Sequence, residues 1–339
     1  FLKSLGLTDG FDVSNPDRLV TRGEYTALAV KIFNPTITIK NDGTFYDVKP
    51  SHTYSFAIYT ALGYGLLRGT SEGEFRPDDN ITFAAAVKIL IAALGYENYA
   101  YITGGYPAGY IVEANNIKLT QGVSASFVNE ELTFSKAVIL ISNALRCDIN
   151  KATSVSDDLV KNARAYDCSC LTEYFKFTLI EGIVTTAGFS SMDENYYSEE
   201  NKFEVGGTML KSSITEDEKY LGRNVSAWYD AESGTLRAML LKTSNKSVTI
   251  DAEKIYSYTD FDIKAETGSN GTSTHYSLDK GYSFVLNGRL IAPSDADFLY
   301  DAGNMTLIDN DNDGDYDVIL AHSIKYFVVS GIDTFAKTI

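Results

Sequence analysis

The densest group of side chains that could hold a metal ion lies near the C-terminus, where residues 309–317 read D-N-D-N-D-G-D-Y-D. The pattern D-x-D-x-D-G is typical of the first half of a calcium loop, because the carboxylates share one concave side and glycine allows the sharp bend. We expect Ca²⁺ to be bound by the carboxylates of Asp309, Asp311 and Asp313, with the Asp315 carbonyl and Asp317 as further ligands.

This segment departs from a helix–loop–helix calcium site in two ways. Position 12 of the loop is Leu320, where an EF-hand has a bidentate glutamate, and the flanking residues alternate as in strands. The sequence therefore predicts a calcium loop carried by a β-hairpin. The alternative is an acidic Asp-Gly turn that needs no cation.

Residues that serve in catalysis do not form a recognisable motif in this chain. His52, His275 and His322 are far apart, and the sequence contains no H-E-x-x-H, G-x-S-x-G, phosphate-binding loop or dinucleotide fingerprint. Nothing singles out a carboxylate pair for glycoside hydrolysis among the 45 acidic residues. We therefore expect a protein that is not an enzyme.

Composition limits the partners of the chain. Acidic residues outnumber basic ones by 45 to 29, which gives a net charge of −16 and argues against nucleic acid, whose affinity depends on cationic contacts to phosphate. No apolar run approaches the roughly 20 residues of a membrane helix, so no membrane insertion is expected, and no signal peptide is visible. The abrupt start at Phe1 suggests a piece of a longer, processed protein.

The three cysteines, Cys147, Cys168 and Cys170, are too few for a disulfide framework. Cys168 and Cys170 are too close in sequence to pair easily, whereas Cys147 could reach either one. Three free thiols are the favoured interpretation, because a structural zinc site needs four nitrogen or sulfur ligands. Pairing of Cys147 with Cys168 or Cys170 remains the alternative.

The N-terminal half contains three copies of one unit, aligned on Thr21, Thr82 and Thr133. Each threonine is expected to cap a helix, because its hydroxyl can accept a hydrogen bond from the free amides of the first turn. In the first copy Glu24 is at N3 and predicts a capping box. The apolar helices that follow are expected at Tyr25–Phe33, Ala86–Leu94 and Ala137–Leu145.

The same motifs recur around these helices in a fixed order. They are F-Y-D-V (45–48), G-L-L-R-G (65–69), F-R-P-D-D (75–79), T-R-G-E (21–24) and G-G-Y-P-A-G-Y (104–110). This order resembles the S-layer homology (SLH) repeat of bacterial surface proteins, with copies at about 1–36, 45–97 and 99–147. The resemblance implies a mainly-α, pseudo-threefold prism with outer helices, such as those expected at 51–62 and 107–116, around three central ones.

The resemblance also implies a function and its site. SLH repeats anchor extracellular proteins to the cell wall by binding peptidoglycan-linked secondary cell-wall polysaccharide. Carried over residue by residue, the glycan-binding positions are Arg22, Asp47 and Gly69. The other two copies have Phe83 and Phe134 in place of the arginine, so one binding groove at most is expected. The tryptophan of the family falls near Thr53, so its stacking surface is missing.

The C-terminal half is expected to be a β-rich domain, 171–339, after a partly helical linker, 148–170. Short alternating segments predict an antiparallel barrel or sandwich, and Ser257–Tyr276 is expected to be an exposed loop. The half resembles the β-rich domains that follow SLH repeats in clostridial surface proteins. The strands are expected at Phe175–Thr186, Lys202–Val205, Asn224–Tyr229, Thr235–Lys242, Lys246–Ile250, Ser283–Leu286, Asn304–Asp309, Asp317–Ala321 and Lys325–Val329.

Together these patterns favour a non-catalytic protein of the extracellular cell wall or cell surface, anchored by residues 1–147. The alternative is a carbohydrate- or ligand-binding surface protein whose β domain is the recognition module and whose SLH unit is only structural.

Overall fold

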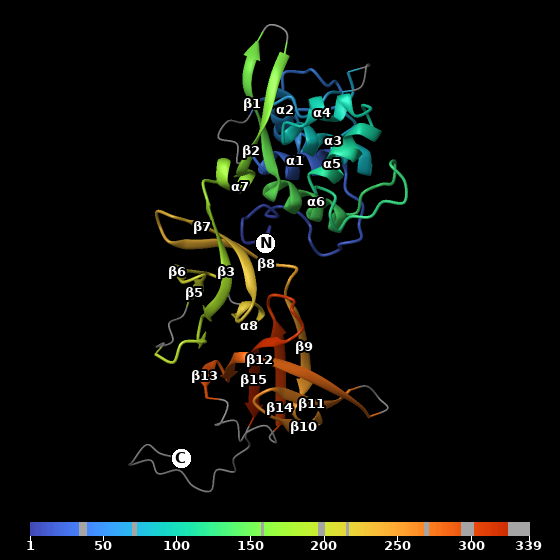
Figure 1. The fold of residues 1–339 in the computed structure, drawn as a ribbon. Coiled ribbons are helices and arrows are strands. Elements are labelled where there is room, and N and C mark those ends of the chain that lie inside the picture. The colour runs from blue at the N-terminus through green and yellow to red at the C-terminus, as the bar shows by residue number, and fades with distance from the viewer. Residues whose placement is uncertain are drawn as a thin grey trace, which may run out of the picture. The chain divides into compact units, whose positions relative to one another are not determined.

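The computed structural model describes residues 1–33, 39–69, 73–156, 159–195, 201–214, 217–267, 271–292 and 302–324. The chain divides into two compact units, Phe1–Thr178 and Leu179–Ile339. The first unit contains most of the helices and the second most of the strands (Figure 1). The predicted combination of a helical N-terminal part and a β-rich C-terminal part is therefore confirmed. In the described parts of the chain, no helix combines the length and the apolar character needed to cross a membrane.

Three central helices begin directly after the three predicted threonine caps. They are α1 (Arg22–Lys31), α3 (Phe83–Ala93) and α6 (Phe134–Arg146). The hydroxyls of Thr21, Thr82 and Thr133 each accept a hydrogen bond from the amide three residues later, so the predicted caps are confirmed. The predicted capping box, in which the Glu24 side chain would accept a hydrogen bond from the Thr21 backbone N–H, is not formed. The Glu24 carboxylate instead accepts hydrogen bonds from the guanidinium of Arg18, whose two-pronged geometry suits a carboxylate.

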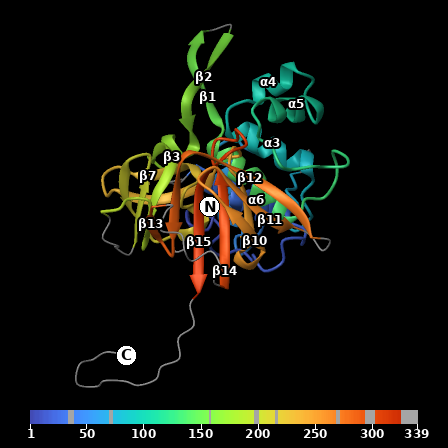
Figure 2. The same ribbon diagram turned by 60° about the horizontal axis from the view of Figure 1, so that its bottom comes forward.

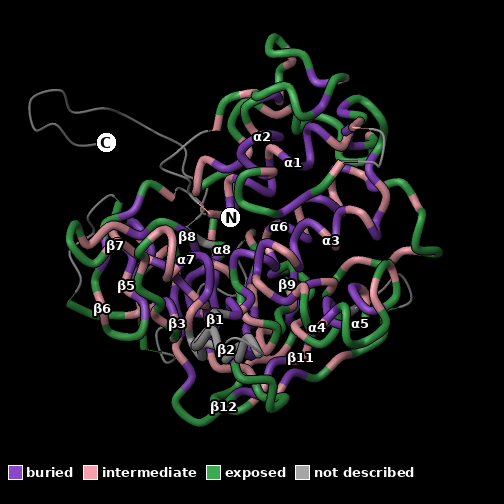
Figure 3. The backbone as a smooth tube through the Cα atoms, turned by 90° about the horizontal axis from the view of Figure 1, so that it is seen from above, coloured by how far each residue is buried: buried purple, intermediate pink, exposed green. Residues whose placement is uncertain are grey.

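A cyclic set of backbone hydrogen bonds joins the residues that precede the three threonines. The Val20 N–H donates to the Leu132 carbonyl (3.0 Å), the Leu132 N–H to the Ile81 carbonyl (2.9 Å), and the Ile81 N–H to the Val20 carbonyl (2.9 Å). All three side chains are buried. Figure 3 shows that buried residues also recur along the helices that follow. Each segment therefore contacts the other two in the same way.

Shorter helices surround the central ones. They are α2 (Ser55–Gly63), α4 (Glu97–Ile102) and α5 (Ala108–Asn116). The predicted helix at 107–116 is confirmed, whereas the one expected from Ser51 begins only at Ser55, after turns. Helix α4 was not expected, because its six residues, E-N-Y-A-Y-I, are too few to show a helical period.

The expectation of a partly helical linker at 148–170 is wrong. Strands β1 (Asp148–Ser156) and β2 (Leu159–Ser169) form an antiparallel hairpin in the first unit, and the four-residue helix α7 (Cys170–Glu173) follows. β-branched residues at Ile149, Thr153, Val155 and Val160 favour strands here, and cross-strand pairing outweighs the weak helical signal.

The second unit is built on one large sheet. In the described residues its strands run in the order β5-β6-β8-β7-β3-β4-β13-β12-β15-β14-β9, and β11 pairs with β12 and β10. Figures 1 and 2 show β14 and β15 side by side near the C-terminal end. The bounds are β3 (Thr178–Ala187), β4 (Ser190–Ser191), β5 (Lys202–Val205), β6 (Thr208–Lys211), α8 (Asp217–Tyr220), β7 (Asn224–Asp230), β8 (Thr235–Leu241), β9 (Lys246–Asp251), β10 (Ile255–Tyr258), β11 (Asp262–Thr267), β12 (Thr272–Leu286), β13 (Arg289–Ile291), β14 (Ala302–Asp309) and β15 (Tyr316–Ile324).

The sheet is mixed, so the expectation of a purely antiparallel sheet is wrong. Strands β12 and β15 pair in parallel, which is possible because β13 and β14 intervene in sequence and allow a crossover. The pairings do not establish a closed barrel. Two separate groups of buried side chains form the core, one around Phe203 and Leu236 and the other around Phe284 and Leu307.

The prediction of an exposed loop at Ser257–Tyr276 is also wrong, because this segment contains β11 and parts of β10 and β12. The segment is polar overall, but Ile263 and Ala265 are both buried. They are two residues apart on β11, so they lie on the same face of the strand. The predicted strand Lys325–Val329 lies outside the described residues.

Candidate functional site

A cavity of about 200 Å³ lies beside Arg22 in the first unit. Its polar lining comes from four segments: the start of α1, the stretch that follows α2, helix α3 and the loop before α5. The lining residues are Arg22, Leu66, Leu67, Arg68, Phe75, Ala85, Lys88, Ile89 and Tyr106. We call this space the Arg22 cavity.

Arg22 is held against Phe75. Its Nε donates to the Phe75 carbonyl (2.9 Å), and its guanidinium carbon lies 5.0 Å from the centre of the Phe75 ring. Burial lowers the pKa of Arg22, although nearby Asp79 and Tyr106 act in the opposite direction. In the described residues, no protein acceptor is bonded to the two terminal nitrogens, which leaves them for a ligand.

Two further cations, Arg68 and Lys88, line the same cavity. Lys88 Nζ lies 5.3 Å from the ring centre of Tyr106, whose side chain is half exposed. Within the described ranges none of the three cations of the cavity forms an ion pair with a carboxylate. Three like charges around one small cavity repel one another, so an anion would be stabilised there.

Sequence reasoning identified Arg22 but did not assign Arg68 or Lys88 to the site, and it favoured a core position for Tyr106, which is half exposed. Lys88 offered a signal, because it is the one charged residue in the otherwise apolar helix F-A-A-A-V-K-I-L-I-A-A. Arg68 is the one charged residue of G-L-L-R-G. Tyr106 could not be assigned to this cavity from sequence, because it is distant from Arg22 along the chain.

Asp47 does not line the Arg22 cavity but supports it. Its carboxylate accepts hydrogen bonds from the backbone N–H of Phe75 (2.9 Å) and of Arg76 (2.6 Å). Because the Phe75 carbonyl holds Arg22, Asp47 fixes the loop that positions the arginine.

Gly69 lies next to Arg68 and outside the cavity lining. A Cβ at this position would lie 2.4 Å from Phe45 Cε1 and 2.9 Å from the Glu74 carbonyl oxygen. Glycine is therefore required here for close packing of the chain that carries Arg68.

The residues that follow the caps Thr82 and Thr133 are uncharged. They are Phe83 and Phe134, which are both buried, and the guanidinium carbon of Arg18 lies 4.4 Å from the centre of the Phe134 ring. A phenylalanine in this position contributes to the core of the unit and cannot donate a hydrogen bond to an anion.

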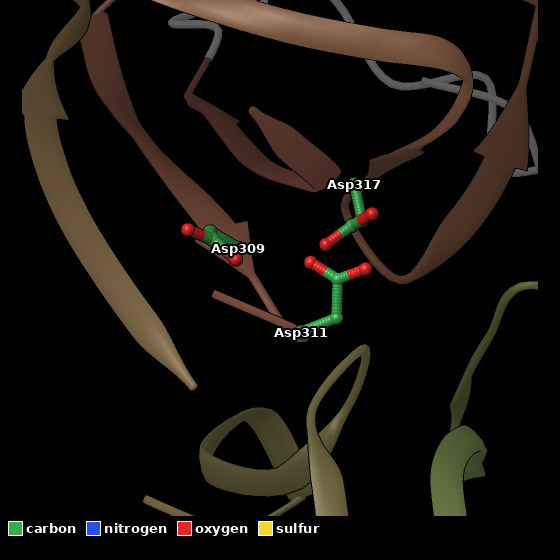
Figure 4. A group of neighbouring side chains, drawn as sticks. All are labelled: Asp309, Asp311 and Asp317. Carbon is green, nitrogen blue, oxygen red and sulfur yellow. The ribbon is translucent and has the colours of Figure 1, made fainter. Parts of the chain in front are cut away.

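The acidic turn between β14 and β15 brings together three of the five aspartates predicted as metal ligands. Carboxylate oxygens of Asp309, Asp311 and Asp317 lie within 4.8 Å of one another, and Figure 4 shows Asp311 and Asp317 facing each other. Asp313 and Asp315 are exposed and do not belong to this group.

The three carboxylates of this turn differ in environment. Asp309 is buried and accepts hydrogen bonds from the backbone N–H of Asn312 (2.5 Å) and Gly314 (3.2 Å). Asp317 accepts one from the Asn310 N–H (2.8 Å). Burial, and then the neighbouring aspartates, raise the pKa of Asp317, so its negative charge is unfavourable without a cation.

Comparison with known proteins identifies a family for part of the first unit. The S-layer homology domain matches residues 44–87, which include Asp47, Arg68, Gly69 and Phe75. The matched residues thus include several of those that line the Arg22 cavity.

Three relatives share sequence with about half of the chain. The middle cell wall protein of Brevibacillus brevis is 25% identical over 183 residues, which is 52% of this chain and 17% of the relative. The surface layer protein of Brevibacillus choshinensis is 24% identical over 184 residues, 52% of this chain and 16% of the relative. A cell surface protein of Thermoanaerobacter kivui is 23% identical over 158 residues, 44% of this chain and 20% of the relative.

The aligned region spans about a fifth or less of these relatives. The names of these relatives and the matched domain all refer to the cell wall or the cell surface. The chain contains an S-layer homology domain and is an extracellular protein of the cell wall or cell surface.

Proposed function

We propose that residues 1–147 form three S-layer homology repeats that anchor the chain, without catalysis, to secondary cell-wall polysaccharide linked to peptidoglycan. Binding takes place in the Arg22 cavity, so one groove of the three carries it. The observation that supports this proposal is the convergence of Arg22, Arg68 and Lys88 on a single cavity of about 200 Å³.

The chemistry of this cavity suits a sugar that carries a carboxylate or another anionic substituent. The free nitrogens of Arg22 can bond two oxygens of such a group at once, while Arg68 and Lys88 supply further positive charge. The half-exposed Tyr106 ring offers a face on which an apolar side of the sugar could pack. Tyr106 thereby takes over the stacking surface that is missing near Thr53.

Co-sedimentation with purified cell-wall sacculi tests this proposal. A hydrogen bond to a charged group contributes about 1.5–3 kcal/mol, so Arg22→Ala should weaken binding about 10- to 100-fold. Arg237→Ala is the matched control, because Arg237 is an arginine of β8 in the other unit. Sacculi stripped of secondary polysaccharide should not bind the wild type. Equal binding by the wild type and by the Arg22→Ala variant would contradict the proposal.

We also propose that the turn between β14 and β15 binds Ca²⁺ through Asp309, Asp311 and Asp317. The raised pKa of Asp317 favours this, because burial, and after it the neighbouring aspartates, make its negative charge unfavourable, and a divalent cation would offset both effects. Exposed Asp313 and Asp315 supply no ligand from their side chains in this geometry.

Thermal unfolding with calcium or with a chelator checks this second proposal. A folded-state pKa above the ordinary value of 3.8 means that Asp317 stabilises the fold at acid pH and that this contribution is lost as pH rises through the raised value. Asp317→Asn should therefore raise Tm at neutral pH in chelator and abolish any rise with calcium. Asp315→Asn is the control and should respond to calcium as the wild type does. An unchanged wild-type Tm at millimolar calcium would remove the site.

A further inference from the structure

Two cysteines flank the pair of residues that closes the base of the β1–β2 hairpin. Asp148 and Ser169 are opposite each other in its antiparallel register, next to a register shift between Asp148 and Asn150. Cys147 immediately precedes Asp148 and Cys170 immediately follows Ser169, so the two cysteines are the next residues beyond this pair.

The backbone is extended on both sides of this pair, at Cys147 (φ −65°, ψ 144°) and at Ser169 (φ −85°, ψ 171°), and Cys170 is the first residue of helix α7. Asp148 and Ser169 are opposite residues of antiparallel strands, whose Cα atoms lie about 4.5–5.5 Å apart. Cys147 and Cys170 are the immediate chain neighbours of these two residues, and a disulfide requires their Cα atoms to lie about 4.4–6.8 Å apart.

The surroundings of the two thiols are consistent with this placement. Cys147 and Cys170 are both buried, at 9% and 0% exposure, and are free thiols in the structure. The Cys147 thiol donates to the Ile117 carbonyl (3.2 Å). Burial raises the pKa of Cys170, and the neighbouring Cys147 acts in the same direction, ahead of Cys168.

The third cysteine is placed differently. Cys168 lies in β2, two residues before Cys170, and is only half buried. Its thiol donates to the Glu173 carboxylate at 3.5 Å, within α7. Cys168 is therefore offset from Cys147 and has a partner of its own.

We propose that Cys147 and Cys170 form a disulfide in the extracellular protein and that Cys168 remains a free thiol. The two thiols lose two protons and two electrons as the S–S bond forms. A low-molecular-weight disulfide accepts them and is reduced to two thiols.

This bond has a defined structural effect. It closes the chain segment that contains β1 and β2 and ties the end of α6 to the start of α7. The raised pKa of Cys147, about 12, slows attack by the buried thiolate, so oxidation proceeds in chains whose hairpin is still open.

Peptide mapping of the full chain tests the bond. The protein is refolded with oxidised glutathione, unfolded without reductant and alkylated, and the thiols are counted. One alkylated cysteine, Cys168, and a Cys147–Cys170 cross-link are expected, with a Tm that falls when reductant is added. Cys168→Ser should leave no free thiol and keep the cross-link, which also removes the ambiguity of a peptide that contains both Cys168 and Cys170.

Three outcomes would overturn the proposal. They are three alkylated cysteines in the wild type, a Cys147–Cys168 cross-link, and survival of an intramolecular cross-link in Cys170→Ser. Because the wild type itself is mapped, the result does not depend on the folding of any variant.

Discussion

Arg22 shows how one side chain depends on its neighbours for its orientation. Its Nε is bonded to the Phe75 carbonyl and its charged plane lies over the Phe75 ring, so the side chain is fixed before any ligand arrives. A ligand that binds this arginine therefore pays little of the entropy of ordering a flexible side chain. The two phenylalanines at the equivalent positions keep the packing and lose the donors.

The Asp47→Ala variant tests whether Asp47 positions Arg22 or contacts the glycan directly. Asp47→Ala removes the acceptor of two backbone amides, at Phe75 and Arg76, and should cost about 1–3 kcal/mol of stability. It should also weaken sacculus binding, because the Phe75 carbonyl that holds Arg22 is no longer fixed. Thermal unfolding and co-sedimentation are measured on the same samples, with Asp47→Asn as the control that keeps one acceptor oxygen. Loss of binding at unchanged Tm would mean that Asp47 contacts the glycan itself.

At the residue scale, sequence patterns found the arginine but not the cavity around it. Arg22 follows a threonine cap and belongs to a recognisable motif, so its position was predictable. Lys88 and Tyr106 line the same cavity as Arg22 only because segments that are distant in sequence pack together. Similarly, five aspartates were predicted as ligands, yet the path of the turn brings together the carboxylates of only three of them, Asp309, Asp311 and Asp317, among the described residues.

The threonine caps explain why the three central helices could be predicted as elements. Each cap is a local interaction between residues three apart, so it needs no knowledge of the fold. The β1–β2 hairpin and the strands within 257–276 depend instead on cross-strand pairing within hairpins, which no single turn of chain displays. Their polar composition conceals that pairing, and for this reason both segments were assigned wrongly.

Removing one cap should have a measurable effect on the first unit. Thr82→Ala deletes the acceptor of the Ala85 amide and should cost about 1 kcal/mol, a fall in Tm of roughly 2–4 °C for a unit of this size. Thr82→Ser keeps the hydroxyl and should retain most of the stability. If serine were as destabilising as alanine, the methyl group of Thr82 would be the stabilising part and the cap would not.

At the scale of the whole molecule, the chain consists of two units, each with buried side chains of its own. The division into helical and β-rich parts follows from the change of hydrophobic period, which a sequence displays. The order of strands in the large sheet could not be predicted from the sequence, because the parallel pairing of β12 with β15 depends on a crossover through intervening strands.

The central claim is that the first unit, through Arg22, binds wall polysaccharide. Calorimetric titration of residues 1–178 and of residues 179–339 with solubilised secondary cell-wall polysaccharide tests it most directly. Residues 1–178 should bind saturably, Arg22→Ala should weaken that binding about tenfold or more, and residues 179–339 should release no heat of binding. Saturable binding by residues 179–339 alone, or full affinity of the Arg22→Ala variant, would contradict the account.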